Sequence, residues 1–198
     1  MVLKKVGAKV QTFWTTTKRI VVMLACWGLV FSIATIGRLA VAFDYDDTLV
    51  FSAPAYAKAF AAATVPYSPQ FWSVLNQSYD LERPKLVSCS LAWFFRLFGF
   101  RVSILTSRQA TDGEALRKEW RHLTPKGHFI FTGDKSSLHN HLKEGNYLLF
   151  FGDKDSDIAE ARKADVYPIR IRRSTKSAYK EDYHPGTMGE LSIPLSEY

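Results

Sequence analysis

The sequence predicts an α/β domain built on a doubly wound parallel sheet, with a small cap inserted after the first strand. Short apolar runs recur from residue 39 onward, and amphipathic stretches separate them. Runs this apolar are typical of parallel strands that helices cover on both faces. The expected strands cover residues 39–43, 101–105, 128–131, 147–151 and 166–171. The expected helices cover residues 84–98, 111–123, 136–144 and 156–164.

Two segments depart from this rhythm. Residues 51–82 are rich in alanine and aromatic residues and contain Pro54, Pro66 and Pro69, and they are too long for a simple connection. We interpret them as the cap over an active site. Residues 172–198 are polar and contain glycine and proline, so we expect an extended tail there.

The composition bounds the class of protein. The chain has 198 residues, of which 47% are hydrophobic and 23% charged, as in one folded globular domain. Its two cysteines exclude a disulfide framework or a cysteine-rich zinc module. Residues 1–38 carry six basic residues and no acid, whereas the rest carries 20 basic and 19 acidic residues. The nearly neutral body argues against a nucleic acid polymer as partner.

The basic start is followed by a run without charged residues from Ile20 to Ile36. We therefore interpret residues 1–38 as a signal peptide or membrane anchor and residues 39–198 as the functional domain. Small residues at Ser32 and Ala34 favour export with cleavage after Ala34. Two alternatives stay open: an uncleaved anchor with the domain outside, and an apolar core helix of the domain.

Acidic and hydroxyl side chains follow three of the expected strands. Asp44 and Asp46 follow the first strand, Thr106 ends the second, and Asp153 and Asp157 follow the fourth. Ligands of an open parallel sheet bind at the carboxyl ends of its strands, so these groups are expected to converge. Clustered carboxylates are tolerated together when they bind a hard cation such as Mg²⁺. The pattern indicates phosphoryl transfer, in which one aspartate attacks phosphorus and a second moves protons.

These motifs resemble those of the haloacid dehalogenase (HAD) superfamily, and in particular the class B bacterial acid phosphatases. The segments that carry the resemblance are FDYDDTLVFSAP (43–54), PQFW (69–72), ILTSR (104–108), FFGDKDSDI (150–158), AEARKADVYPIRI (159–171) and LSEY (195–198). The similarity covers essentially all of residues 39–198. It implies a HAD-like fold, an Mg²⁺-dependent phosphatase in the periplasm (alternatively anchored in the inner membrane), and a homotetramer as the possible assembly.

The resemblance also implies roles for individual residues. Asp44 is the nucleophile and a metal ligand, and Asp46 is the acid/base, whose backbone carbonyl also binds the metal. The other metal-binding residues are Asp153 and Asp157. The phosphate-binding side chains are Thr106, Arg108 and Lys135, with Lys143 as the alternative lysine. The residues expected around the leaving group are Tyr56, Trp72 and Tyr179.

We therefore interpret the protein as a phosphatase that acts on small phosphomonoesters, nucleoside monophosphates among them, and that also transfers phosphate to alcohols. Two rivals remain: a HAD phosphatase dedicated to one metabolite, and a membrane-tethered binding module that has lost turnover.

The arginines Arg170, Arg172 and Arg173 alternate at the end of the last strand, which predicts a solvated sheet edge.

Overall fold

A computed structural model describes residues 14, 17–29, 39–124, 127–133, 135–177 and 182–198. The chain divides into two compact units, Met1–Arg38 and Leu39–Tyr198. In the first unit, residues 17–29 form a helix. No helix of the described residues is long and apolar enough to span a membrane. Residues 30–38, which complete the predicted signal or anchor, lie outside the described residues, and so does the cleavage position after Ala34.

The second unit is built on a parallel sheet, as the sequence predicts. Within its described residues the sheet has six strands in the order β5-β4-β1-β6-β7-β8. Their bounds are Ala40–Asp44 for β1, Arg101–Thr106 for β4, Phe129–Phe131 for β5, Tyr147–Gly152 for β6, Tyr167–Ile171 for β7 and Leu191–Ile193 for β8. The central strand β1 pairs with β4 on one side and β6 on the other, and all five of its residues are buried.

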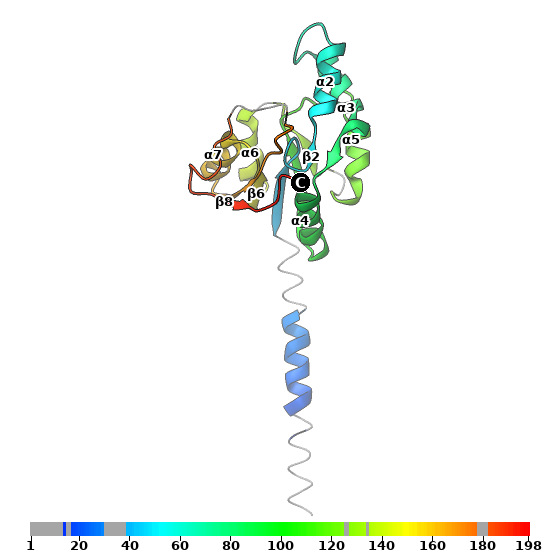
Figure 1. Cartoon of the computed structure of the whole chain (residues 1–198). Coiled ribbons are helices and arrows are strands. Elements are labelled where there is room, and N and C mark those ends of the chain that lie inside the picture. The colour runs from blue at the N-terminus through cyan, green and yellow to red at the C-terminus, as the bar shows by residue number, and fades with distance from the viewer. Residues whose placement is uncertain (1–13, 15–16, 30–38, 125–126, 134, 178–181) are drawn as a thin grey trace, which may run out of the picture. The chain divides into compact units, whose positions relative to one another are not determined.

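Helices cover both faces of the sheet (Figure 1). On one face lie α4 (Leu86–Leu97), α5 (Glu114–Glu119) and the 3₁₀ helix η2 (Trp120–His122). On the other face lie α6 (Lys135–Glu144) and α7 (Asp155–Lys163). The predicted helix at 111–123 is therefore a short α-helix that continues as a 3₁₀ turn.

The alternation of side chains along β1 decides which groups face which layer. Val41 and Phe43 pack into the core under α4 and α5, where Phe43 stacks on Phe151 with ring centroids 4.3 Å apart. Ala40 and Ala42 pack into the core under α6 and α7. Because successive side chains of a strand point to opposite faces, Asp44 belongs to the α6/α7 side.

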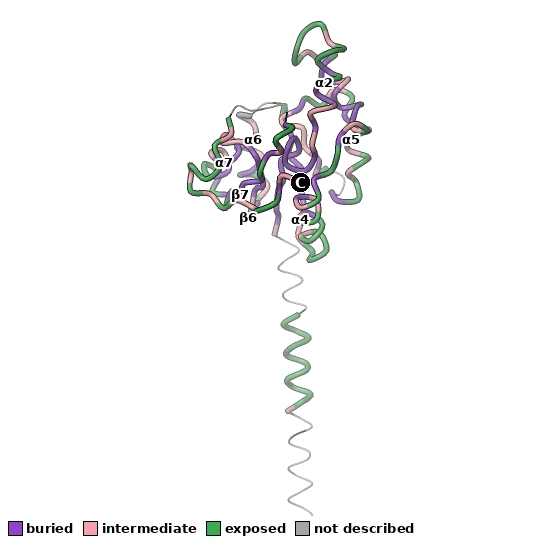
Figure 2. Tube along the Cα trace, in the orientation of Figure 1, coloured by how far each residue is buried: buried purple, intermediate pink, exposed green. Residues whose placement is uncertain are grey.

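Residues that follow β1 form a helical insertion. It contains β2 (Val50–Phe51), α2 (Ala53–Ala62), α3 (Pro69–Gln77), η1 (Tyr79–Leu81) and β3 (Arg83–Pro84). β2 and β3 pair antiparallel, so the two ends of the insertion meet at its base. Its own core consists of alanine, leucine and aromatic side chains of α2 and α3, separate from the two cores of the sheet. Figure 2 shows this buried stripe along α2, with exposed residues around it.

The C-terminal segment differs from the predicted extended tail. Leu191–Ile193 forms β8, which pairs parallel with β7 as an edge strand of the sheet. Its three residues include only two large aliphatic side chains, which is too short a pattern for period-two analysis to detect.

Candidate active site

Asp44, the last residue of β1, lies at the carboxyl edge of the sheet and is 5% exposed. Its carboxylate accepts a hydrogen bond from Thr48 at 3.3 Å, and the Lys154 ammonium lies 3.7 Å away. Burial raises the pKa of Asp44 well above its ordinary value; Lys154 opposes this shift, and the nearby carboxylates of Asp157 and Asp153 add to it. Burial and the neighbouring carboxylates destabilise the ionised form of Asp44, and a cation beside it would stabilise that form.

Three buried carboxylates meet at this edge, one at the end of β1, one just after β6 and one in the first turn of α7. Ligand atoms of Asp44, Asp153 and Asp157 all lie within 4.8 Å of one another. Asp157 is held at the start of α7, where its Oδ2 accepts a hydrogen bond from the backbone N–H of Lys154 at 3.1 Å. Oxygen donors in a compact set are the ligands that Mg²⁺ prefers, so these residues fit the ion that the sequence predicts.

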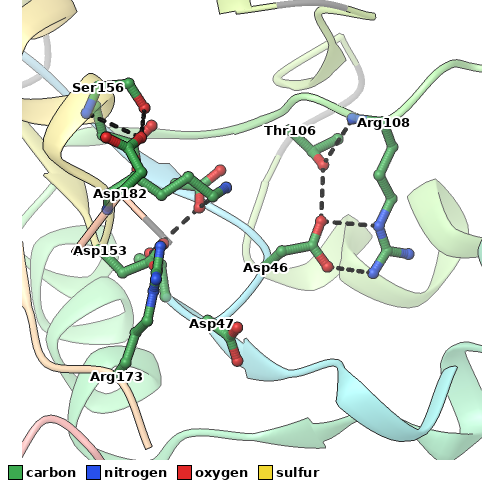
Figure 3. Close-up of polar contacts among 12 residues, drawn as sticks. Asp46, Asp47, Thr106, Arg108, Asp153, Ser156, Arg173 and Asp182 are labelled. Carbon is green, nitrogen blue, oxygen red and sulfur yellow. Dashed lines mark hydrogen bonds and ion pairs between the residues drawn. The ribbon is translucent and has the colours of Figure 1, made fainter. Parts of the chain in front are cut away.

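Asp46 lies on the other side of the site and is paired with Arg108 (Figure 3). The guanidinium donates from Nε at 3.0 Å and from Nη2 at 2.5 Å, which is a bidentate ion pair. Arg108 also donates to Glu82 at 2.5 Å. Burial alone would raise the pKa of Asp46, but the charge and hydrogen bonds of Arg108 hold it below its ordinary value.

Two threonine hydroxyls contact the carboxylates of the site, and one of them bridges two carboxylates. Thr106, which ends β4, is buried and lies 3.5 Å from Asp46. Thr48 lies 3.3 Å from oxygens of both Asp44 and Asp153, so it bridges β1 and β6. A small cavity beside Asp44 is lined in part by Thr106, Lys154 and Asp157. Hydroxyls and an ammonium around one carboxylate suit an anion such as phosphate.

Lys154 is a site residue that the sequence analysis missed. Burial alone would lower its pKa, but Asp44, Asp157, Asp153 and Asp46 around it raise that pKa well above its ordinary value. It is therefore a permanent cation within the acidic cluster. The sequence signal for it is its position directly after Asp153, at the end of a buried strand.

The two lysines proposed for phosphate binding lie at opposite ends of α6. Lys135 begins this helix, but its side chain lies outside the described part of the structure. Lys143 is exposed near the end of the helix, just before β6 begins. Since Asp44 lies at the carboxyl end of the parallel strands, Lys143 is at the wrong end of the sheet to reach it.

The predicted leaving-group residues are distributed unevenly. The Tyr56 hydroxyl donates to Asp46 at 3.3 Å, and the ring is 5.6 Å from the Arg108 guanidinium. Trp72 is 8% exposed and packs edge-on against Phe71, in the core of the helical insertion. Tyr179 lies outside the described residues.

The expected solvated sheet edge is wrong for two of its three arginines. Arg170 is fully buried, and it donates to the Asp153 backbone carbonyl and the Asp155 carboxylate, both at 2.7 Å. Arg173 is 8% exposed and pairs with the Asp153 carboxylate. Arg172 is exposed, as predicted. The carboxylates of the site supply partners for these cations, which a count of alternating charges could not show.

Comparisons with known proteins identify relatives of this chain. A class B acid phosphatase of Klebsiella pneumoniae (strain 342) is 34% identical over 174 residues, which covers 81% of this chain and 73% of that protein. A class B acid phosphatase of Salmonella typhi is 33% identical over 177 residues, with the same coverage. No family model matches the chain.

Solved structures agree on the fold. CbbY from Rhodobacter sphaeroides, in complex with phosphate, has a TM-score of 0.57 and 13% identity, and the match covers 80% of this chain and 94% of that one. A haloacid dehalogenase-like family hydrolase from Xanthomonas campestris has a TM-score of 0.50 and 12% identity, with 80% and 91% covered.

Proposed function

Because the chain belongs to the class B acid phosphatases, a HAD-type family of phosphoric monoester hydrolases, we propose that it cleaves small phosphomonoesters through a phosphorylated Asp44. The observation that carries this proposal is that the buried Asp44 and Asp46 lie two residues apart at the carboxyl end of β1, each beside a basic side chain. The membership also speaks against a binding module without turnover.

In the first half-reaction, a carboxylate oxygen of Asp44 attacks phosphorus, and the bond between phosphorus and the ester oxygen breaks. Asp46 gives a proton to that oxygen, so the alcohol leaves neutral. In the second half-reaction, Asp46 takes a proton from water, whose oxygen attacks phosphorus and releases inorganic phosphate and free Asp44. An alcohol in place of this water gives phosphate transfer.

Side chains around the reacting atoms neutralise the transferring group. Lys154 lies next to Asp44, and Thr106 lies beside Asp46. Nη1 of Arg108 is buried without a hydrogen-bond partner among the described residues, which leaves one donor for a substrate oxygen. Lys135 remains the proposed fourth phosphate group, since its helix begins at this edge of the sheet.

We further propose that Asp44, Asp153, Asp157 and the backbone carbonyl of Asp46 hold Mg²⁺. When bound there, the ion neutralises charge on the transferring phosphate and favours the ionised form of Asp44. The support is the compact set of buried carboxylates and the raised pKa of Asp44.

One assay tests the mechanism: hydrolysis of a chromogenic phosphate ester with Mg²⁺, and with a chelator. We expect the chelator to abolish turnover, and Asp44→Asn to abolish it because the nucleophile is gone. Asp46→Asn is expected to be severely impaired and to accumulate covalent phosphate with a good leaving group. Asp165→Asn, an exposed site far along the chain, is the matched control. Wild-type rates for Asp44→Asn refute the mechanism.

For the substrate, we propose broad specificity with a preference for aryl and nucleoside esters over a single dedicated metabolite. Tyr56 lies against both Asp46 and Arg108, and Trp72 belongs to the same aromatic core, with Tyr179 proposed beside them. Base stacking of this kind contributes about 1–3 kcal/mol in other proteins. Trp72→Ala is expected to slow aryl phosphate hydrolysis more than glycerol phosphate hydrolysis. Equal factors for both exclude the role in discrimination.

For location, we propose export to the periplasm with cleavage after Ala34; retention as an inner-membrane anchor is the competing outcome. The support is the basic, acid-free start and the uncharged run that follows it. Amino-terminal sequencing of the exported protein tests it: a first residue of Thr35 supports cleavage, whereas Met1 in the membrane fraction supports the anchor.

For assembly, we propose a homotetramer that uses the outer face of α4. Leu86, Phe94, Leu97 and Phe98 are 50–79% exposed along this helix, an apolar stripe that a second copy would cover. Figure 2 shows the lower part of α4 as exposed. Leu97→Glu is expected to lower the mass measured by light scattering, and an unchanged mass contradicts this face.

A further inference from the structure

A cleft of about 490 Å³ lies on the α4 side of the sheet, away from the acidic edge. Its lining comes from the residues after β1, from η1, from α4 and from η2. It shares no lining residue with the cavity beside Asp44. The separation follows from strand alternation, because Tyr45 continues the Val41 and Phe43 face while Asp44 continues the opposite one. A cleft of this volume accepts a small organic molecule.

Four aromatic side chains form the walls: Tyr45, Tyr79, Trp93 and Trp120. Trp120 meets Tyr45 edge to face, with ring centroids 5.6 Å apart and an interplanar angle of 88°. Trp93 is 42% exposed at the mouth. Aromatic faces attract cations through their quadrupole, and tryptophan does so most strongly.

The charged groups of the cleft are of one sign. Asp80, Glu82 and Glu119 line it, and among the described residues no lysine or arginine does. Asp80 and Glu119 are exposed, and neither carboxylate has a hydrogen bond or ion pair in the part of the chain that the structure describes. Glu82 is 8% exposed at the floor. The remaining polar lining includes His122. Aromatic walls with unpaired carboxylates at the mouth complement an ammonium group on an apolar body.

We propose that this cleft binds a small organic cation, and that the bound cation regulates the phosphatase through Glu82 and Arg108. The regulatory part rests on the proposed function, whereas the binding part does not. An ammonium group satisfies the free carboxylates Asp80 and Glu119, and its apolar body contacts Trp93 and Trp120. The acidic lining of this cleft disfavours a ligand that carries phosphate.

The floor of the cleft connects to the acid/base by a series of direct contacts. Trp120 donates from Nε1 to the Tyr45 hydroxyl at 3.2 Å, and this hydroxyl in turn donates to Glu82. The other oxygen of Glu82 accepts from Arg108, whose guanidinium also lies 4.8 Å from the Tyr45 ring centroid. Arg108 is thus shared by Glu82 and Asp46. A cation bound in the cleft attracts the Glu82 carboxylate at its floor; this attraction competes with Arg108 and so alters the hold of Arg108 on Asp46.

Calorimetric titration of the full-length chain with phenethylammonium tests the binding, with 2-phenylethanol as the uncharged probe of similar shape. We expect saturable binding of the ammonium, and binding of the alcohol weaker by about threefold or more. Trp93→Ala and Glu119→Gln are each expected to weaken ammonium binding by about threefold or more. The matched controls are Tyr167→Ala, an exposed aromatic residue on β7, and Glu114→Gln on α5, which do not line the cleft and should leave the affinity unchanged.

Three results overturn the binding site: no saturable binding, equal affinity for the alcohol, or equal effects of cleft and control variants. Mutual exclusion with inorganic phosphate also overturns it, because the amine would then occupy the catalytic site; a limited change in phosphate affinity is the linkage that the regulatory role predicts. For regulation, saturating phenethylammonium is expected to change kcat/KM at least twofold in the wild type, with a smaller change in Trp93→Ala at the same concentration. An unchanged kcat/KM at saturation removes the regulatory role while the binding measurement still stands on its own.

Discussion

Arg170 is a buried cation whose replacement should destabilise the fold, because its side chain contacts three different segments. It is fully buried, and its three donor groups contact Glu190 at 2.9 Å, the Asp153 carbonyl at 2.7 Å and Asp155 at 2.7 Å. These partners come from three places: the segment before β8, the end of β6 and the start of α7. The guanidinium therefore joins the C-terminal edge of the sheet to a proposed metal ligand.

Arg170→Met removes the charge and leaves Glu190, whose side chain is also fully buried, with backbone donors alone. Removing one partner of a buried ion pair costs about 3–5 kcal/mol. In a unit of this size, 1 kcal/mol corresponds to about 2–4 °C, so the melting temperature should fall by about 6–20 °C. Arg170→Lys keeps the charge but cannot fork, and it should lose at least one charge-assisted bond of about 1.5–3 kcal/mol.

Thermal unfolding followed by circular dichroism measures these changes. Arg172→Met is the matched control, because Arg172 follows the same strand and is exposed, and we expect a change within about 0.5 kcal/mol. The double variant Arg170→Met with Glu190→Gln should be less destabilised than the sum of the single variants, since the two side chains are in contact. Equal melting temperatures for Arg170→Met and Arg172→Met would refute the reasoning.

Three further predictions concern pH and the proposed metal site. Burial lowers the pKa of Lys85 to about 8, so above that pH the unfolded chain binds more protons than the folded chain. The free energy of unfolding should therefore rise by about 1 kcal/mol from pH 7 to 9. Urea unfolding should show this rise in the wild type, and Lys85→Met should lack it. A Cβ on Gly152 would lie 2.7 Å from Asp157, so Gly152→Ala should weaken Mg²⁺ activation. Gly145→Ala, which crowds a tyrosine ring at the other end of the sheet, should affect stability alone. Because burial raises the pKa of Asp44, the acid limb of kcat/KM should move to lower pH as Mg²⁺ is raised, and a fixed limb contradicts metal binding at Asp44.

The fold could be predicted because its signals are local and strong. The strand at 40–44 has no polar residue before Asp44, and its alternation of alanine with larger side chains matches the two helical layers that cover it. The strand ends then place Asp44, Thr106 and Asp153 at one edge by topology alone. Nothing of comparable length marks β8, where Leu191 and Ile193 flank a single serine.

The cations of the site could not be predicted in the same way. Lys154, Arg108 and Arg173 each reach their carboxylate from a different element, and the last spans 20 residues of sequence to Asp153. Sequence spacing shows that an arginine follows a strand, but it does not show whether the fold places a carboxylate beside that arginine. A buried arginine and a solvated one therefore look alike until the fold places their neighbours.

The electrostatic settings of Asp44 and Asp46 run against the ionisation that the proposed mechanism needs. The nucleophile must be ionised, yet burial raises the pKa of Asp44; the general acid must be protonated, yet Arg108 holds the pKa of Asp46 down. A divalent cation beside Asp44 favours its ionised form. A phosphate dianion that draws on Arg108 weakens the pair with Asp46 and favours its protonated form. In the proposed mechanism, each carboxylate therefore reaches its working state when its own ligand is bound, so turnover would depend on joint occupancy of the proposed metal and phosphate positions.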